Sequence, residues 1–136
     1  MVQIDIEYQG DLRCQATHVP SGQKLLTDAP LDKHGKGEFF SPTDLTATAL
    51  GTCLATVMGI LARKEGIDLA GLKISVQKEM IARPRRRIGQ LSVRVSFPCQ
   101  LSAEQKTKFE NVAQYCPVHE SLHPDVVMPM EFIYPA

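Results

Sequence analysis

The sequence contains no tryptophan, few other aromatic residues and no excess of one charge. Aromatic residues make up 6% of the 136 positions, which disfavours a base-stacking or sugar-binding surface. Lys and Arg together number 15, as do Asp and Glu, whereas a dedicated binder of nucleic acid or anionic membrane carries a clear cationic excess. Phosphate-binding loops, Gly-x-Ser-x-Gly elbows and dinucleotide fingerprints are also missing. We therefore expect no nucleic-acid or membrane partner.

Cysteine is scarce as well. Its four positions are too few for a small disulfide scaffold, and no N-terminal signal pattern precedes the first acidic residue, Asp5. These features predict a reducing cytoplasm, where a cysteine is more often catalytic, metal-bound or inert than part of a structural disulfide.

One uncharged stretch, residues 45–62, approaches the length of a membrane-spanning helix. It contains four threonines, two glycines and four alanines, so its hydrophobicity is low for a helix in lipid. The mean hydropathy of the whole chain is -0.11, which is typical of a soluble protein. We interpret the stretch as the central helix of a soluble fold, buried on all sides.

The N-terminal third predicts an antiparallel meander. Apolar and polar residues alternate over residues 2–9, the period of a half-buried strand. Turn signals at Gly10 and at residues 20–22 separate this strand from two more, expected at residues 13–19 and 23–27.

The central helix has a clear start. Ser41 suits the N-cap, Pro42 the first helical position and Asp44 the third, as in a capping box. We expect the helix to end near Lys64, before Gly66.

The remaining chain predicts a strand hairpin over residues 72–80 and 91–97, a helix capped at residues 102–105 and a final strand over residues 130–134. This order indicates a single α+β domain spanning residues 1–136. Because the central helix is apolar on every side, one thin sheet covers only part of it. A second copy of the chain is the simplest cover, so we expect a homodimer.

Two cysteines stand out as candidates for chemistry. Cys53 lies within the central helix among small residues, where a packed core normally holds Leu or Ile. Cys116 precedes Pro117; if a helical turn begins there, Cys116 is its N-cap, where the helix dipole favours a thiolate. His119 and His123 follow and could supply hydrogen bonds or a proton. The alternative for each cysteine is a small buried hydrophobe.

Two weaker patterns remain. Cys53, Cys116, His119 and His123 have the ligand types of a tetrahedral zinc site, although the position of Cys53 matches no standard zinc spacing. An arginine-rich run at residues 83–87 could bind phosphate or an acidic partner; in a chain of zero net charge a solvated hairpin tip is the more common outcome.

The segments FSPTDLTATALGTCLATVMGI and CPVHESLHP, the second beginning at Cys116, together resemble the OsmC/Ohr family of osmotically inducible and organic-hydroperoxide-resistance proteins, in its Ser-Pro-x-Asp-Leu branch. The resemblance implies an OsmC-like fold, with antiparallel sheets packed on a long buried central helix. It also implies an intertwined homodimer with active sites at the subunit interface. Members reduce organic hydroperoxides with two cysteine thiols, without metal, haem or flavin, so no cofactor is expected.

The resemblance also assigns roles. Cys53 matches the cysteine that attacks the peroxide, and Cys116 matches the resolving cysteine that forms a disulfide with it; an external dithiol then restores both thiols. Only a thiolate is nucleophilic, so a cation is needed near Cys53. In the hydroperoxide-reducing members of the family this cation is an arginine of the N-terminal meander. Arg13 is the only arginine in the meander of this chain, so the resemblance assigns the role to Arg13.

The acidic residue that orients the arginine in hydroperoxide reductases directly follows the helix-starting proline. Here that position is Thr43, with Asp44 one place later, so Asp44 and the preceding Glu38 are the candidates for this role. The function implied is that of a thiol-dependent peroxidase in oxidative-stress defence. The alternative is a non-enzymatic module of the same fold that serves as a redox switch or binds a small apolar ligand.

Overall fold

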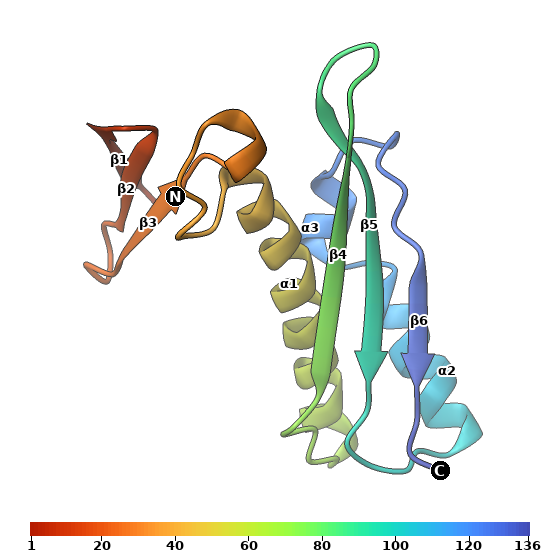
Figure 1. The fold of residues 1–136 in the computed structure, drawn as a ribbon. Helices are drawn as coiled ribbons and strands as arrows, with labels where there is room; N and C mark the ends of the chain where they lie inside the picture. Colours follow the sequence, from red (N-terminus) through yellow and green to blue (C-terminus); the bar gives the residue numbers. More distant parts are fainter. The chain divides into compact units, whose positions relative to one another are not determined.

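A computed structural model describes all of residues 1–136, which form two compact units, residues 1–46 and residues 47–136. The N-terminal unit is a three-stranded antiparallel meander of β1 (Ile4–Gly10), β2 (Arg13–His18) and β3 (Lys24–Asp28), in that order (Figure 1). A short 3-10 turn, η1 (Leu31–Lys33), follows. The predicted meander is confirmed, because alternation and turn signals are local properties of the sequence.

One face of this meander is apolar and exposed. Ile6 pairs with Ala16, which pairs with Leu25, so these side chains share a face. Ile4 on the same face is 57% exposed, Ile6 69% and Tyr8 62%. The N-terminal unit therefore presents an apolar sheet face that its own residues do not bury.

The long helix α1 spans Pro42–Glu65 and ends at Gly66, whose φ of 69° is the left-handed conformation that suits a residue after a helix. Leu50, Leu54 and Met58 on one face are completely buried. Thr52 and Ile60 on another face are exposed. We expected burial on all sides, but within one chain only one face of α1 is covered. By length and composition alone α1 could cross a membrane, a test that the core helix of a soluble protein also passes.

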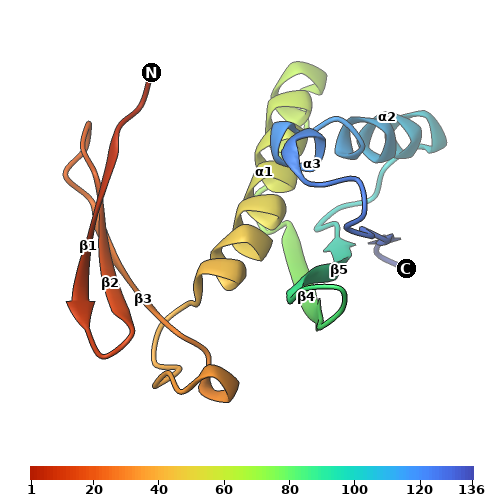
Figure 2. The ribbon, with the colours of Figure 1, turned by 90° about the horizontal axis from the view of Figure 1, so that it is seen from above.

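The C-terminal unit places its helices on one face of a second three-stranded sheet (Figures 1 and 2). Strand β4 (Lys73–Ile81) pairs antiparallel with β5 (Arg87–Ser96), and β6 (Met130–Ile133) pairs parallel with β5. The parallel pairing differs from the antiparallel sheets that we expected. It arises because α2 (Ala103–Ala113) and α3 (Pro117–Ser121) cross over between β5 and β6.

The core of this unit lies between the sheet and α1. Leu91 and Val95 of β5 are completely buried, as is Phe109 of α2. A Cβ added at Gly51 of α1 would lie 3.2 Å from a methyl group of Val76 on β4. Gly51 thus allows α1 to approach the sheet closely, and this packing fixes the helix segment that carries Cys53.

Candidate active site

The C-terminal unit brings together two cysteines that are 63 residues apart in the sequence. Cys53 comes from the middle of α1, and Cys116 directly precedes α3. Both are free thiols. Cys53 packs against the core cluster that contains Cys116, and the two thiols are close enough to influence each other's ionisation. Neither local segment predicts this proximity, which depends on how α1 packs against the segment between α2 and α3.

Local sequence explains the position of Cys116. Pro117 starts α3, and Cys116 is its N-cap with extended backbone angles of -69° and 142°. The Cys116 sulfur accepts a hydrogen bond from the His119 backbone N–H at 3.2 Å, and the side chain is completely buried. The prediction of a helical turn beginning at Pro117 is confirmed.

Burial raises the pKa of the Cys116 thiol above its ordinary value. The backbone N–H groups of His119 and Val118 act in the opposite direction, and the nearby Cys53 thiol adds to the increase. We expected the helix N-terminus to favour a thiolate at Cys116; its N–H groups do act in this direction, but burial outweighs them. Helix α3 has only five residues, so its dipole is too small to offset the loss of hydration.

Cys53 has a different environment. It is half-buried at the edge of the core, whereas Cys116 is completely buried. The small residues beside it include Gly51 and Thr52, and the Thr52 hydroxyl donates to the Thr48 carbonyl at 2.8 Å. Cys53 is therefore the more accessible sulfur of the pair.

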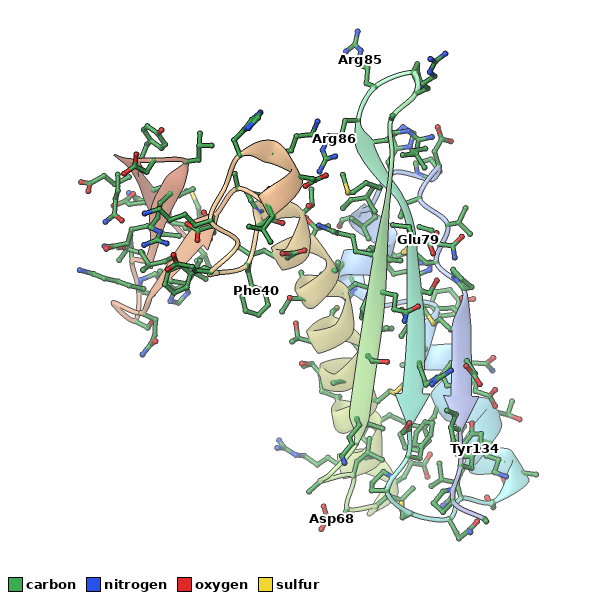
Figure 3. All side chains as sticks on the ribbon, in the orientation of Figure 1. Phe40, Asp68, Glu79, Arg85, Arg86 and Tyr134 are labelled. Atoms are coloured by element: carbon green, nitrogen blue, oxygen red, sulfur yellow. The ribbon has the colours of Figure 1, made fainter.

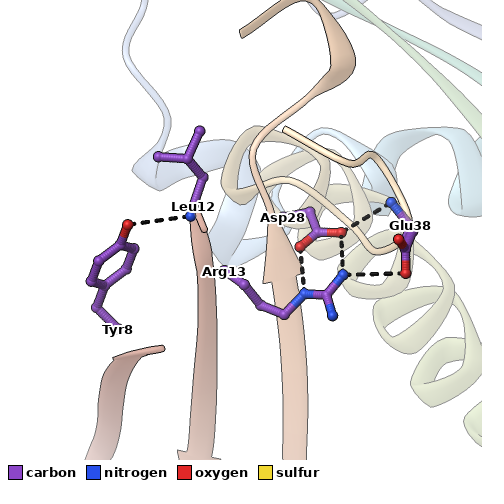
Figure 4. Close-up of polar contacts among 5 residues, drawn as sticks. All are labelled: Tyr8, Leu12, Arg13, Asp28 and Glu38. Atoms are coloured by element: carbon purple, nitrogen blue, oxygen red, sulfur yellow. Dashed lines mark hydrogen bonds and ion pairs between the residues drawn. The ribbon is translucent and has the colours of Figure 1, made fainter. Parts of the chain in front are cut away.

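The N-terminal unit contains an ion cluster around Arg13 (Figure 4). The Arg13 guanidinium donates to Asp28 with an Nε–Oδ1 distance of 2.7 Å and an Nη2–Oδ2 distance of 3.0 Å, and to Glu38 Oε2 at 3.3 Å. The Glu38 backbone N–H also donates to Asp28 Oδ2 at 3.0 Å, and the Phe39 ring lies 4.7 Å from the guanidinium carbon. Arg13 is thus held in place from two sides.

Asp28 is the member of this cluster that sequence reasoning missed. Its hydrogen bonds with Arg13 lower the pKa of the carboxyl group and raise the pKa of the guanidinium. One cation therefore faces two carboxylates, and the cluster as a whole has no positive excess. The register of the meander explains this contact, because Arg13 pairs directly with Asp28 across β2 and β3.

The structure places Asp44 in a capping box at the start of α1. Asp44 Oδ2 accepts from the Ser41 backbone N–H at 2.9 Å, and the Asp44 backbone N–H donates to Ser41 Oγ at 3.1 Å. This is the predicted helix start. Of the two acidic candidates, Glu38 contacts Arg13 and Asp44 stabilises the helix terminus.

The two histidines after Cys116 make local hydrogen bonds. His119 offers its main-chain N–H to the Cys116 sulfur, and His123 Nδ1 accepts from the Asp125 backbone N–H at 3.0 Å. Groups of three or more His, Cys, Asp or Glu side chains suited to a metal ion are not found.

The fold and site define a class: an α+β protein in which a long helix and the start of a short one bring two free thiols near each other. A family model described as OsmC-like protein matches residues 35–131. The chain belongs to this family, and the α+β class with an OsmC-like fold is confirmed.

Solved structures agree with this assignment. A protein of Psychrobacter arcticus 273-4, named for osmotic stress induction and a detoxification response, is 43% identical with a TM-score of 0.93, over 97% of this chain and 96% of that chain. An organic hydroperoxide resistance protein OsmC of Legionella pneumophila is 13% identical with a TM-score of 0.79, over 98% of this chain and 96% of that chain. The organic hydroperoxide resistance protein OhrB of Bacillus subtilis is 16% identical with a TM-score of 0.70, over 97% of each chain. At such low identity the last two share the fold alone. No curated protein matches the sequence.

Proposed function

We propose that this protein is a thiol-dependent peroxidase that reduces organic hydroperoxides in oxidative-stress defence. The proximity of Cys53 and Cys116 is the observation that carries this function. Free thiols held this close, one half-buried and one completely buried, are suited to cycle between a dithiol and a disulfide. The names of family relatives, which refer to hydroperoxide resistance and osmotic stress, point the same way.

The more accessible sulfur acts first. The Cys53 thiolate attacks the outer oxygen of ROOH, the O–O bond breaks, and the alkoxide takes a proton and leaves as an alcohol. Cys53 becomes a sulfenic acid. Cys116 suits the second role because its raised pKa keeps it protonated and its burial keeps it from the peroxide.

The second step forms the disulfide. The Cys116 sulfur displaces the hydroxyl group of the Cys53 sulfenic acid, and water leaves with the Cys116 proton. An external dithiol then transfers two electrons and two protons to the bridge by thiol–disulfide exchange and itself becomes a disulfide. The cycle needs no metal or organic cofactor.

We assign the supporting roles to the predicted residues. By the family resemblance we keep Arg13 as the residue proposed to favour a thiolate at Cys53, with Asp28 and Glu38 both sharing its charge. Asp44 fixes the start of α1, the helix that carries Cys53. The uncovered faces of β1 and α1 support a homodimer with active sites at the subunit interface. We propose a cytoplasmic location, where an external dithiol is available.

The test uses cysteine variants and an alkyl hydroperoxide such as tert-butyl or cumene hydroperoxide, with dithiothreitol as the reductant. Cys53→Ser abolishes turnover, because the attacking sulfur is gone. Cys116→Ser retains one oxidation event per chain but does not form the intramolecular bridge. Intact-mass measurement after one equivalent of peroxide distinguishes the species: wild type loses two hydrogens, and Cys116→Ser gains one oxygen.

Cys14→Ser and Cys99→Ser are the matched controls, since both remove a half-buried thiol outside the pair. They are expected to turn over like wild type. Equal activity in wild type and Cys53→Ser would rule out the peroxidase. A reversible disulfide combined with a hydroperoxide rate no faster than that of a free thiol would instead support the redox-switch or ligand-binding alternative.

A further inference from the structure

The tip of the β4–β5 hairpin concentrates positive charge. Residues 83–87 contain four arginines, and the sequence between Glu79 and Glu104 contains five arginines and no Asp or Glu. The whole chain has equal numbers of basic and acidic residues. The cationic tip, defined as Arg83, Arg85, Arg86 and Arg87, is therefore a local departure from an otherwise balanced surface.

The four arginines of the tip differ in exposure. Arg83, Arg85 and Arg86 are exposed, and Arg87 is half-buried. Figure 3 shows Arg85 pointing away from the ribbon at the far end of the hairpin. The fifth arginine of the stretch, Arg94, lies further down β5 and pairs with Glu131 at 3.2 Å. The exposed charges of Arg83 and Arg85 thus lie at the projecting end of the hairpin (Figure 1).

The tip lies at the same end of the unit as the short helix that follows Cys116. The Val127 backbone N–H donates to the Gly89 carbonyl at 3.0 Å, and the Leu91 N–H donates to the Val127 carbonyl at 2.9 Å. Residues 122–126 connect this paired segment to α3, whose N-cap is Cys116. In Figure 1 the hairpin tip extends beyond the end where α3 lies, and α2 lies toward the other end. A macromolecule bound at the tip would be close to the thiol-bearing end of the unit.

We propose that the cationic tip docks an acidic segment of the protein that reduces the Cys53–Cys116 disulfide. This proposal rests on the proposed function, which requires such a reductant. Two thiols on the partner give up two electrons and two protons, their sulfurs join, and the bridge opens to two thiols. The guanidinium groups attract and orient carboxylates on the partner, because the planar fork of arginine pairs well with them.

The shape and composition of the tip favour an acidic protein over other anions. A small anion needs a concave site, whereas this charge lies on a projecting turn. A nucleic acid needs many phosphate contacts or aromatic stacking, and the tip has four cations and no aromatic residue. The disulfide, finally, can be reduced only by a molecule that carries thiols or an equivalent donor.

The experiment measures how fast the oxidised protein is reduced by synthetic Cys-x-x-Cys peptides flanked by Glu, Ser or Lys residues. At low ionic strength the Glu-flanked peptide is expected to react roughly tenfold faster than the Ser-flanked one, through electrostatic steering. Added salt removes the advantage. Arg83→Ser/Arg85→Ser also removes it, and Arg83→Glu/Arg85→Glu transfers it to the Lys-flanked peptide.

The matched control is Arg63→Ser/Lys64→Ser, which removes the same charge from the last turn of α1 and is expected to retain the preference. Equal loss in both double variants, or no preference in wild type, would overturn the proposal. Dithiothreitol distinguishes a failure of the docking proposal from a failure of the proposed function. If the variants affect only docking, dithiothreitol reduces the disulfide equally fast in all of them. If the disulfide never forms, the peroxidase function itself is contradicted.

A second readout does not depend on the disulfide. Fluorescence anisotropy measures binding of a thiol-free Glu-rich peptide and of a short DNA duplex to the reduced protein. Arginine-dependent binding of the peptide supports the docking site. Tighter binding of the duplex would replace the acidic protein with a nucleic acid as the partner and overturn the proposal.

Discussion

The two cysteines differ most clearly in their exposure. Cys116 is completely buried and its sulfur accepts a backbone hydrogen bond, while Cys53 is half-buried. Burial raises the pKa of the Cys116 thiol, so this sulfur stays protonated above the pH at which ordinary thiols, with a pKa of about 8.5, ionise. Both properties reduce its reactivity toward reagents in solvent.

We therefore predict that iodoacetamide alkylates Cys53 before Cys116 in the reduced, folded protein. Peptide mass mapping over a time course, repeated at several pH values, measures both rates. The rate at Cys116 should begin to rise only at a pH above that of an ordinary thiol. In urea the difference should vanish, since both thiols are then exposed. Equal rates in the folded protein would contradict the burial described here.

At this scale the sequence predicted which residues to examine but not all of their surroundings. Cys53 and Cys116 were identified from small neighbours, a following proline and a family resemblance, and the structure places them close enough to influence each other's ionisation. Their catalytic roles stay predictions. Asp28 was missed because its hydrogen bonds with Arg13 depend on strand register rather than on neighbouring residues.

At the scale of single elements, α1 is the clearest case. Its start and end were predictable because capping boxes and C-terminal glycines are local signals. Its burial was not predictable, since the sequence shows that every side is apolar but not which face packs against the sheet. The parallel pairing of β6 was likewise unpredictable, because it depends on the crossover through α2 and α3.

The two glycines of α1 give a test of its packing. Alanine is favoured over glycine within a helix by about 1 kcal/mol. At Gly59 an added Cβ meets nothing within 4 Å, whereas at Gly51 it lies 3.2 Å from Val76. We predict that Gly59→Ala raises the free energy of unfolding by roughly 1 kcal/mol and that Gly51→Ala gives a smaller gain or a loss. Urea denaturation measures both, and equal stabilisation would contradict the close approach of α1 to β4.

At the scale of the whole molecule, the single chain leaves apolar surface uncovered on both β1 and α1. Exposed apolar surface on an element is typical of an interface. The single domain over residues 1–136 and the intertwined homodimer both stay predictions, because they depend on contacts beyond those within each compact unit.

We predict that the protein sediments at twice the 15.0 kDa mass of the chain at micromolar concentration. Ile6→Lys should shift it toward the monomer, since Ile6 lies on the apolar face of the meander and is 69% exposed in the single chain. Glu7→Lys is the matched control, because the next residue in a strand points to the other face. A wild-type protein that sediments as a monomer would contradict the prediction.

The separation of Cys53 and Cys116 along the chain has a thermodynamic consequence. A covalent link between them encloses a loop of 63 residues, which restricts the unfolded ensemble by about 4 kcal/mol in the chain-entropy account. Oxidation would then make the molecule harder to melt, and its thermal transition would report how much peroxide it has encountered.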